Sequence, residues 1–342
     1  MPLEVRFPGT RRILIVLLGA IGDVTRALPI LPRLRAAYPQ AEIAWAVEPP
    51  SFDLVHHHPW VDRTLLFRRH QGVCGFLAFL REVRQFRADL CLDLQRHLKS
   101  GVVSRASGAP VRLGFARANS REGNWLFLTH HIPPQQHLSS KLLQFQAFAN
   151  YLGAPAQPVG FGLALTPEDN ARVTTLLREV TGPFVAAFVG SSWPSRFWFP
   201  ERTAAVAEEL FVRGLRTVLV GGPNERPFAE QVRNLARCPV LDLTGQTNLR
   251  ELVGIFGRAQ AAWGPDSGPM HLAAAAGTRV VSLWGATSPQ RSAPWNNDAG
   301  VIVGRAPCMP CYRRNCPIGR VCMQNISVEQ VVEAILRMCA ER

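Results

Sequence analysis

The run WGPDSGPMHLAAAAG, from Trp263 to Gly277, constrains the fold of this chain more than any other stretch. Its first half is rich in turn residues, and Asp266 or Ser267 can serve as the N-cap of a helix. Pro269 suits the first helical turn, the alanine-rich body has high helix propensity, and Gly277 suits the position after the helix end. The run therefore predicts a short helix with a defined start and stop.

Apolar residues flank this helix on both sides, from Ala261 to Trp263 and from Val280 to Trp284. The order strand, turn, helix, strand predicts a βαβ unit of a parallel sheet. Ligands of such sheets bind at the carboxyl ends of the strands, where a helix N-terminus favours an anion. We expect a phosphate or diphosphate here, although an ordinary capped turn would show the same pattern.

The remaining chain repeats this alternation of strands and helices in two halves. With 342 residues, 47% of them hydrophobic, it has enough apolar material for two α/β domains with separate cores. The stretch Gly153 to Gly160 is rich in glycine and proline and is the best linker candidate. Two such halves predict a ligand cleft between them.

The net charge of +13 comes mainly from arginine, because only two of the 38 basic residues are lysine and 38 − 2 leaves 36 arginines. Arginine suits bidentate binding of phosphate and carboxylate, which favours an anionic partner such as nucleic acid, a phosphorylated lipid or a sugar nucleotide. A GC-rich genome that encodes arginine in place of lysine would give the same excess.

The N-terminal residues resemble a signal peptide in having basic residues before an apolar run. That run, Ile13 to Leu18, has only the length of a strand and leads into an amphipathic helix. No segment reaches the 18 or more apolar residues of a membrane span. We therefore expect a soluble, cytoplasmic protein that touches membrane only at its surface.

Seven motifs, in family order, resemble the bacterial lipopolysaccharide heptosyltransferases of glycosyltransferase family 9, and most closely the heptosyltransferase I type. They span nearly the whole chain: Leu17 to Pro29, Trp45 to Glu48, Asp93 to Ser100, Arg112 to Glu122, Gly190 to Glu201, Gly221 to Glu225 and Gly264 to Gly277.

This resemblance implies a GT-B fold, in which two Rossmann-like domains with parallel sheets face a central cleft. The N-terminal, acceptor-binding domain would cover residues 1–158 and be completed by a C-terminal helix at 327–342. The nucleotide-sugar domain would cover 159–326. The implied reaction is an inverting transfer, without metal or other cofactor, of heptose from ADP-L-glycero-D-manno-heptose to the Kdo-containing inner core of lipopolysaccharide. Transfer of N-acetylglucosamine, or of a second heptose, is the nearest alternative.

Asp23 is the residue at which the family places its base, and Gly22 beside it allows close backbone approach. Inverting transfer needs a base that takes the proton of the acceptor hydroxyl, and a carboxylate in a cleft can do so. The alternative role is an N-cap of the following helix. Thr25 and Arg26 stand where relatives carry an apolar residue and histidine, which affects the expected acceptor preference.

The family's donor-binding positions lie in the second half of the chain. Arg196 occupies a position where the family has lysine, and it still neutralises phosphate charge. Backbone N–H groups would replace the metal of other glycosyltransferases. Taken alone, His271 suggests a helix residue packed on the sheet, and Glu225 a solvated carboxylate. The expected donor contacts are Ser191, Ser192, Arg196, Glu225, Asp266, Ser267, Gly268 and His271.

Acceptor recognition requires cations, because inner-core sugars carry carboxylates and phosphates. Each cation taken singly reads as an ordinary surface charge, and their grouping around one acceptor is implied by the family. The matching positions are Gly22, Arg68, Arg69, Lys99, Arg121 and His137.

Four of the eight cysteines, Cys308, Cys311, Cys316 and Cys322, have the spacing C-x2-C-x4-C-x5-C. The first gap is typical of zinc sites but the others are not, so a structural metal is the weaker alternative to reduced loop thiols.

Two further classes of function agree with parts of the sequence. A dinucleotide-dependent oxidoreductase should show GxGxxG after the first strand, and the run from Gly19 to Asp23 lacks that spacing. A non-catalytic anion-binding protein would suit the charge, but the arginines are dispersed and no nucleic-acid-binding module is present. The expected partners are the nucleotide-sugar donor, a Kdo-lipid A or related anionic glycolipid and the inner-membrane surface, without nucleic acid.

Overall fold

A computed structural model describes residues 5–340 of the chain. They form two compact units, divided between Gly162 and Leu163. The boundary lies just beyond the predicted linker, in a stretch without helix or strand that runs from Gly153 to the capping residue Thr166. Within residues 5–340, no helix is long and apolar enough to cross a membrane.

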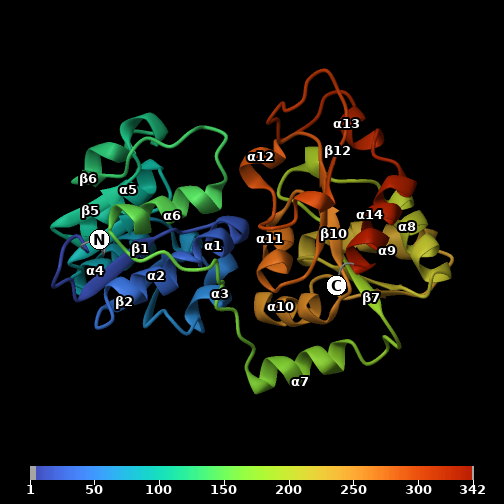
Figure 1. Ribbon diagram of the computed structural model, residues 1–342, viewed down its shortest axis with the longest axis horizontal. Coiled ribbons are helices and arrows are strands. Elements are labelled where there is room, and N and C mark those ends of the chain that lie inside the picture. The colour runs from blue at the N-terminus through green and yellow to red at the C-terminus, as the bar shows by residue number, and fades with distance from the viewer. Residues whose placement is uncertain (1–4, 341–342) are drawn as a thin grey trace. The chain divides into compact units, whose positions relative to one another are not determined.

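The N-terminal unit is a six-stranded parallel sheet in the order β3-β2-β1-β4-β5-β6, with helices packed around it (Figure 1). Residues 13–16 of β1 are fully buried, because a parallel sheet is covered on both faces. The strands are β1 (Arg12–Val16), β2 (Glu42–Val47), β3 (Arg63–Leu66), β4 (Leu90–Asp93), β5 (Val111–Gly114) and β6 (His130–His131). The helices are α1 (Ile21–Ala27), α2 (Ile30–Ala37), α3 (Phe52–His56), α4 (Gly72–Gln85), α5 (Leu98–Ser107) and α6 (Lys141–Tyr151), with 3₁₀ turns η1 (Pro49–Ser51), η2 (Arg69–Gln71), η3 (Arg117–Asn119) and η4 (Asn124–Phe127).

The C-terminal unit has the same topology, in the order β12-β11-β10-β7-β8-β9. Its strands are β7 (Phe184–Phe188), β8 (Arg216–Val220), β9 (Val240–Asp242), β10 (Ala262–Pro265), β11 (Val280–Trp284) and β12 (Val301–Val303). Its helices are α7 (Pro167–Leu176), α8 (Pro200–Val212), α9 (Arg226–Leu235), α10 (Leu249–Arg258), α11 (Gly268–Ala275), α12 (Pro289–Ser292), α13 (Val321–Gln324) and α14 (Val328–Ala340), with 3₁₀ turns η5 (Pro194–Arg196), η6 (Pro223–Glu225) and η7 (Asp298–Gly300). Read from β9, this is the 3-2-1-4-5-6 order of a Rossmann sheet, as it is in the N-terminal unit. The predicted pair of Rossmann-like domains is confirmed.

The C-terminal helix α14 corrects the predicted domain boundary. Val331, Ile335 and Met338 are buried in one hydrophobic cluster with Val206 and Leu210 of α8. Figure 1 shows α14 among the elements of the second unit. The expectation that a helix at 327–342 completes the N-terminal domain is therefore wrong for this structure, because the apolar face of the helix is already covered within its own unit.

The predicted βαβ unit is β10, α11 and β11, and Trp263 pairs with Val281 in parallel register. Ser267 is the N-cap, and Gly277 follows the helix with a φ of +81°, a conformation that glycine adopts without strain. A Cβ on Gly264 would lie 2.1 Å from the carbonyl oxygen of Phe188, so only glycine allows β10 to approach β7 this closely. The glycines thus fix the shape of this unit.

Candidate active site

The predicted donor residues of the C-terminal unit lie where its parallel strands end. Ser191 follows β7, Glu225 follows β8, and Asp266 comes directly after β10. The carboxyl ends of parallel strands meet at one edge of a sheet, which is where open α/β sheets bind ligands. The structure therefore gathers residues from three distant segments at this edge.

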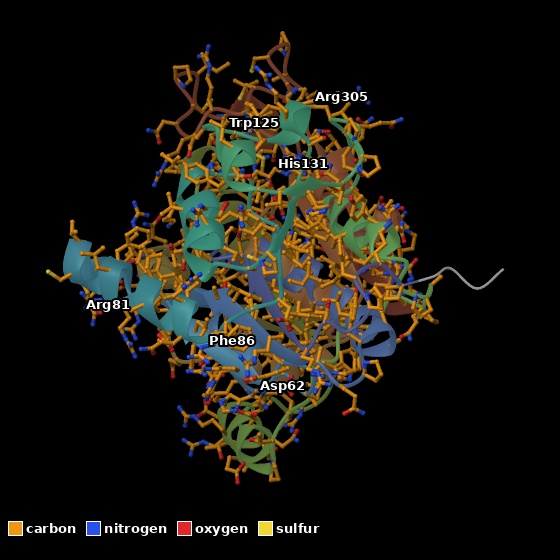
Figure 2. The ribbon with its side chains drawn as sticks, turned by 90° about the vertical axis from the view of Figure 1, so that its left-hand side faces the viewer. Asp62, Arg81, Phe86, Trp125, His131 and Arg305 are labelled. Atoms are coloured by element: carbon orange, nitrogen blue, oxygen red, sulfur yellow. The ribbon has the colours of Figure 1, made fainter. Side chains whose placement is uncertain are left out.

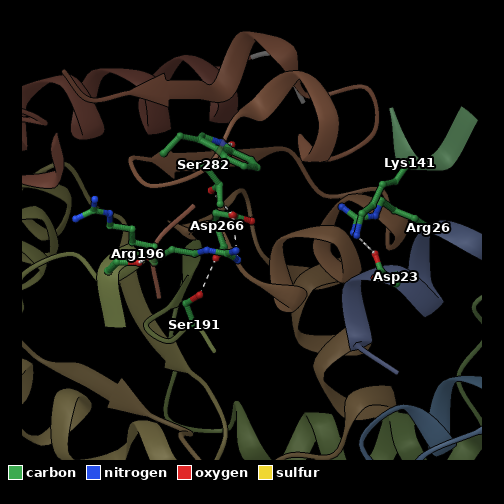
Figure 3. A network of polar contacts seen from close by, with 11 residues as sticks. Asp23, Arg26, Lys141, Ser191, Arg196, Asp266 and Ser282 are labelled. Atoms are coloured by element: carbon green, nitrogen blue, oxygen red, sulfur yellow. Dashed lines mark hydrogen bonds and ion pairs between the residues drawn. The ribbon is translucent and has the colours of Figure 1, made fainter. Parts of the chain in front are cut away.

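Asp266 is the centre of a polar network at this edge (Figure 3). Its Oδ2 lies 3.1 Å from Nη1 of Arg196 and accepts a 2.6 Å hydrogen bond from the hydroxyl of Thr287. Its carbonyl oxygen accepts a 2.8 Å bond from the hydroxyl of Ser191. The guanidinium of Arg196 also stacks over Trp193, 4.1 Å from the ring centroid. Asp266 thus both holds the turn and orients a cation.

The N-terminus of α11 follows this network directly. Ser267 has extended backbone geometry but makes no side-chain cap bond, and its buried Oγ has no hydrogen-bond partner among residues 5–340. Gly268, the next residue, is half-buried and begins the helix. Unpaired helix N–H groups together with a free hydroxyl can bind the oxygens of an anion.

The other predicted donor residues have varied surroundings. His271 is buried on α11, which agrees with packing on the sheet, while Ser192 is exposed. Oε2 of Glu225 accepts a 2.7 Å hydrogen bond from the backbone N–H of Gly222, so Glu225 is not simply a solvated loop carboxylate. Contacts of these three residues with a donor stay predictions.

Asp23 in the N-terminal unit lies in the first turn of α1 and is held by two cations. Its Oδ1 is 2.7 Å from Nζ of Lys141, the first residue of α6, and 2.5 Å from Nη2 of Arg26 (Figure 3). The N-cap of α1 is Ala20, without a side-chain cap bond, so the capping role considered for Asp23 is wrong. The carboxylate is instead part of a charged cluster.

The electrostatics of this cluster keep Asp23 ionised. Burial alone would raise the pKa of the carboxyl, but the charges and hydrogen bonds of Lys141 and Arg26 outweigh it and hold the pKa well below its ordinary value. The side chain is still 27% exposed. A carboxylate that is ionised, oriented and partly accessible can accept a proton from a bound hydroxyl.

A second ion pair of this unit joins Lys99 to Glu48, with Nζ 2.5 Å from Oε1. The same ammonium lies over the ring of Phe67, 5.1 Å from its centroid. The segments that follow β2, β3 and β4, the last of them the start of α5, are thereby connected at the carboxyl edge of the first sheet. Lys99 is therefore a positioned cation, whereas its sequence position alone indicates an ordinary surface charge.

The remaining predicted acceptor residues are not gathered in this way. Gly22 is buried beside Asp23, whereas the side chains of Arg68, Arg69, Arg121 and His137 are exposed. Among residues 5–340, none of these four side chains pairs with Asp23. Their grouping around one acceptor stays a prediction.

Three participants are not evident as site residues from the sequence alone. Lys141 is one of only two lysines in an arginine-rich chain and begins a helix, which is a signal of its importance. Glu48 ends the motif from Trp45 to Glu48, and Thr287 follows β11 in a run of small residues. Their partners are distant in sequence, so pairing them required the fold.

The four clustered cysteines lie between β12 and the end of α13, and all four are free thiols. Cys308 is exposed, Cys311 and Cys316 are half-buried, and Cys322 is buried. No three histidine, cysteine, aspartate or glutamate side chains in the described part of the chain are arranged to hold a metal ion. Whether these cysteines hold a metal stays an untested alternative.

Comparison with known proteins gives the site a context. Residues 76–322 match the model of glycosyltransferase family 9 (heptosyltransferase). A lipopolysaccharide core heptosyltransferase of Haemophilus influenzae is 28% identical over 307 residues, which cover 88% of this chain and 86% of the relative. Lipopolysaccharide heptosyltransferase 1 of Pseudomonas aeruginosa is 25% identical over 322 residues, with coverage of 89% and 87%.

Solved structures show the same fold. A family 9 glycosyltransferase of Veillonella parvula has a TM-score of 0.85 at 21% identity and covers 97% of this chain and 98% of its own. Heptosyltransferase II of Escherichia coli has a TM-score of 0.79 at 20% identity, with coverage of 96% and 99%. The family match covers well over half of the chain, and the architecture agrees over nearly all of it. The chain therefore belongs to glycosyltransferase family 9 and is a glycosyltransferase with the GT-B fold.

Proposed function

We propose that this enzyme transfers heptose from ADP-L-glycero-D-manno-heptose to the Kdo region of the lipopolysaccharide inner core, at the cytoplasmic face of the inner membrane. The relatives that cover most of the chain are named lipopolysaccharide heptosyltransferases, and an E. coli heptosyltransferase of the same fold was solved with ADP. The observation that carries the proposal is the carboxylate of Asp23, held ionised by two cations at the carboxyl edge of the N-terminal sheet.

In the proposed reaction Asp23 accepts the proton of the acceptor hydroxyl. The hydroxyl oxygen forms a bond to the anomeric carbon of the heptose, from the face opposite the diphosphate. The bond between that carbon and the diphosphate oxygen breaks, and its electron pair leaves with ADP. Configuration is inverted because one displacement occurs, and Asp23 later releases the proton to solvent.

The leaving diphosphate gains negative charge, which the C-terminal unit is equipped to stabilise. Arg196 supplies a guanidinium held by Asp266, and the start of α11 supplies backbone N–H groups and the hydroxyl of Ser267. Oriented donors of this kind stabilise developing charge without a metal ion. We therefore propose a metal-independent departure of ADP.

Lys141 and Arg26 have two opposing effects on the proposed base. Their charges keep Asp23 in the deprotonated form that a base requires, and they also reduce its affinity for the proton it must take. We infer that acceptor binding weakens one of these ion pairs, so that the basicity of Asp23 rises when the hydroxyl is in place. Lys141 lies on a different helix from Asp23, whereas Arg26 lies one turn away on the same helix, so Lys141 is the partner that can separate.

Replacement of Asp23 by asparagine tests the assignment of the base. Turnover of ADP-heptose with a Kdo-lipid acceptor is expected to fall by about 10²–10⁴-fold, the usual contribution of a general base. Donor affinity, measured by calorimetric titration, should stay unchanged because the base contacts the acceptor. A correctly folded variant with near-normal turnover would refute the role of Asp23.

The identity of the sugar is tested separately with a panel of nucleotide sugars. Thermal shifts and product formation are compared for ADP-heptose and UDP-N-acetylglucosamine, each with the same acceptor. Stabilisation and turnover by the ADP-heptose donor alone are expected. Transfer of N-acetylglucosamine, or transfer only to an acceptor that already carries one heptose, would instead support the alternative reactions.

A further inference from the structure

Helix α4 of the N-terminal unit has apolar residues on its core-facing side and also on a side that is exposed to solvent. Phe79 and Val83 are buried in the core cluster of the unit. Another side carries Val73, which is 74% exposed, and Leu77, which is 49% exposed. These two residues are four apart and therefore adjacent on the helix surface. The exposed side of α4 thus begins with an apolar patch that the other described residues of its unit leave largely open to solvent.

Positive charge surrounds this patch. Residues 68–87 contain five arginines and one acid, Glu82, so the segment has a net charge of 5 − 1 = +4 without its histidine. Arg81 is exposed and follows Leu77 by one helical turn, while Arg68 and Arg69 are exposed just before the helix. Within the described residues, these three arginines form no ion pair with a carboxylate. Their charge is therefore available to an anionic surface.

The position of the helix suits contact with an extended surface. Figure 2 shows α4 extending outward, with Phe86 at its inner end and Arg81 on its outward portion. The apolar patch belongs to the first helical turns after Gly72, at the outer end. A surface that met this end first would contact Val73 and Leu77 and then the arginines around them.

We propose that the exposed face of α4, formed by Val73, Leu77 and Arg81, docks the enzyme on a bilayer that contains anionic lipids. Exposed apolar residues beside basic ones are typical of segments that lie in a membrane interface, with the apolar side chains among the acyl chains and the arginines among the headgroups. A protein partner would have to supply matching acidic groups, whereas an anionic bilayer presents them everywhere. The proposal extends the proposed function, since it gives a lipid-linked acceptor a docking surface.

Vesicle sedimentation tests the proposal with the full-length protein. The probes are phosphatidylcholine vesicles with and without phosphatidylglycerol, and neither contains an acceptor. The wild-type protein should bind vesicles that contain phosphatidylglycerol, and raised salt should weaken this binding because the charges are exposed. Absence of binding to these vesicles would overturn the proposal, whatever reaction the enzyme catalyses.

The double variant Val73→Ser/Leu77→Ser should bind these vesicles at least about tenfold more weakly, because two apolar side chains no longer leave water. The matched control is Val212→Ser/Leu235→Ser, at positions of the C-terminal unit that are 84% and 50% exposed. The control should bind like the wild type. Equal binding by the two double variants would refute a role of α4.

The charge is tested by Arg81→Gln, for which about fivefold weaker binding is expected from the ~1 kcal/mol that a basic residue contributes at an anionic surface. Arg233→Gln, at an exposed position of α9, is the control. Both variants should turn over a soluble, deacylated acceptor normally. If the Val73→Ser/Leu77→Ser variant changed only the oligomeric state and not vesicle binding, the face would be a contact between copies and the membrane proposal would be wrong.

Discussion

Removal of the charge of Lys141 should move the pH dependence of the enzyme in a direction that the structure fixes. Nζ of Lys141 lies 2.7 Å from Oδ1 of Asp23. A pair of unit charges at this distance attracts by roughly 6 kcal/mol at an effective dielectric constant of ~20 and by roughly 1.5 kcal/mol in bulk water. Asp23 is 27% exposed, so the net effect lies between these limits. We expect Lys141→Met to raise the pKa of Asp23 by about 1–3 units, the usual effect of one close cation.

The direction follows from which form of Asp23 is active. The base works deprotonated, and the native pKa lies below the ordinary value, so kcat/KM of the wild type should not fall until the pH is strongly acidic. In Lys141→Met the carboxylate is protonated at a higher pH, and the acidic limb of the profile should move upward accordingly. The measurement is kcat/KM as a function of pH with a soluble acceptor. The result is the pH at which the acidic limb falls, and not the maximal value of kcat/KM.

Lys141→Arg is the control, because it keeps a positive charge at this position. Its limb should stay close to that of the wild type, even if the different shape of the side chain lowers the rate. A Lys141→Met limb at the wild-type pH, in a folded protein for which Asp23→Asn is inactive, would refute the electrostatic argument. It would mean that another group controls the ionisation of the base.

The other predictions concern the donor and acceptor sites and the stability of the turn at Asp266. Transfer should persist in excess EDTA, and loss of activity that magnesium or manganese restores would contradict a metal-independent departure of ADP. Arg196→Ala should weaken ADP-heptose binding in calorimetry. Arg69→Ala and Arg121→Ala should leave donor affinity unchanged and raise the KM for the acceptor by an amount equivalent to about 1.5–3 kcal/mol. Equal losses of donor affinity in all three variants would contradict the assignment of Arg196 to the donor and of Arg69 and Arg121 to the acceptor. Thr287→Val removes a buried bond to the carboxylate of Asp266 and should lower the free energy of unfolding by about 1–3 kcal/mol, measured by urea denaturation. An unchanged unfolding midpoint would show that this bond adds nothing to stability.

Sequence reasoning worked best where a structure is specified locally. The helix Gly268–Ala275 was predictable because its turn, proline, alanine-rich body and closing glycine lie within one short run. Its flanking strands followed from apolar runs of strand length. The two-domain α/β class followed from repeated alternation of such units. The sugar, the acceptor and the role of Asp23 came instead from resemblance to a family, since no local pattern encodes them.

Tertiary structure alone decided which charged groups meet. The separation between Asp23 and Lys141 is 118 residues along the chain, and Arg196 of η5 meets Asp266, which follows β10, across another nonlocal path. From the sequence, a capping role for Asp23 stood as the alternative to a catalytic one. An acidic residue near a helix start gives the same sequence pattern whether it bonds the helix backbone or a distant lysine. The resemblance placed the C-terminal helix on the wrong domain, and the sequence could not correct this, because an amphipathic helix specifies that one face must be buried but not against which sheet. Periodicity and propensity act over a few residues and determine the elements, whereas the pairing of side chains depends on how strands order themselves in a sheet, and that order is a property of the whole unit.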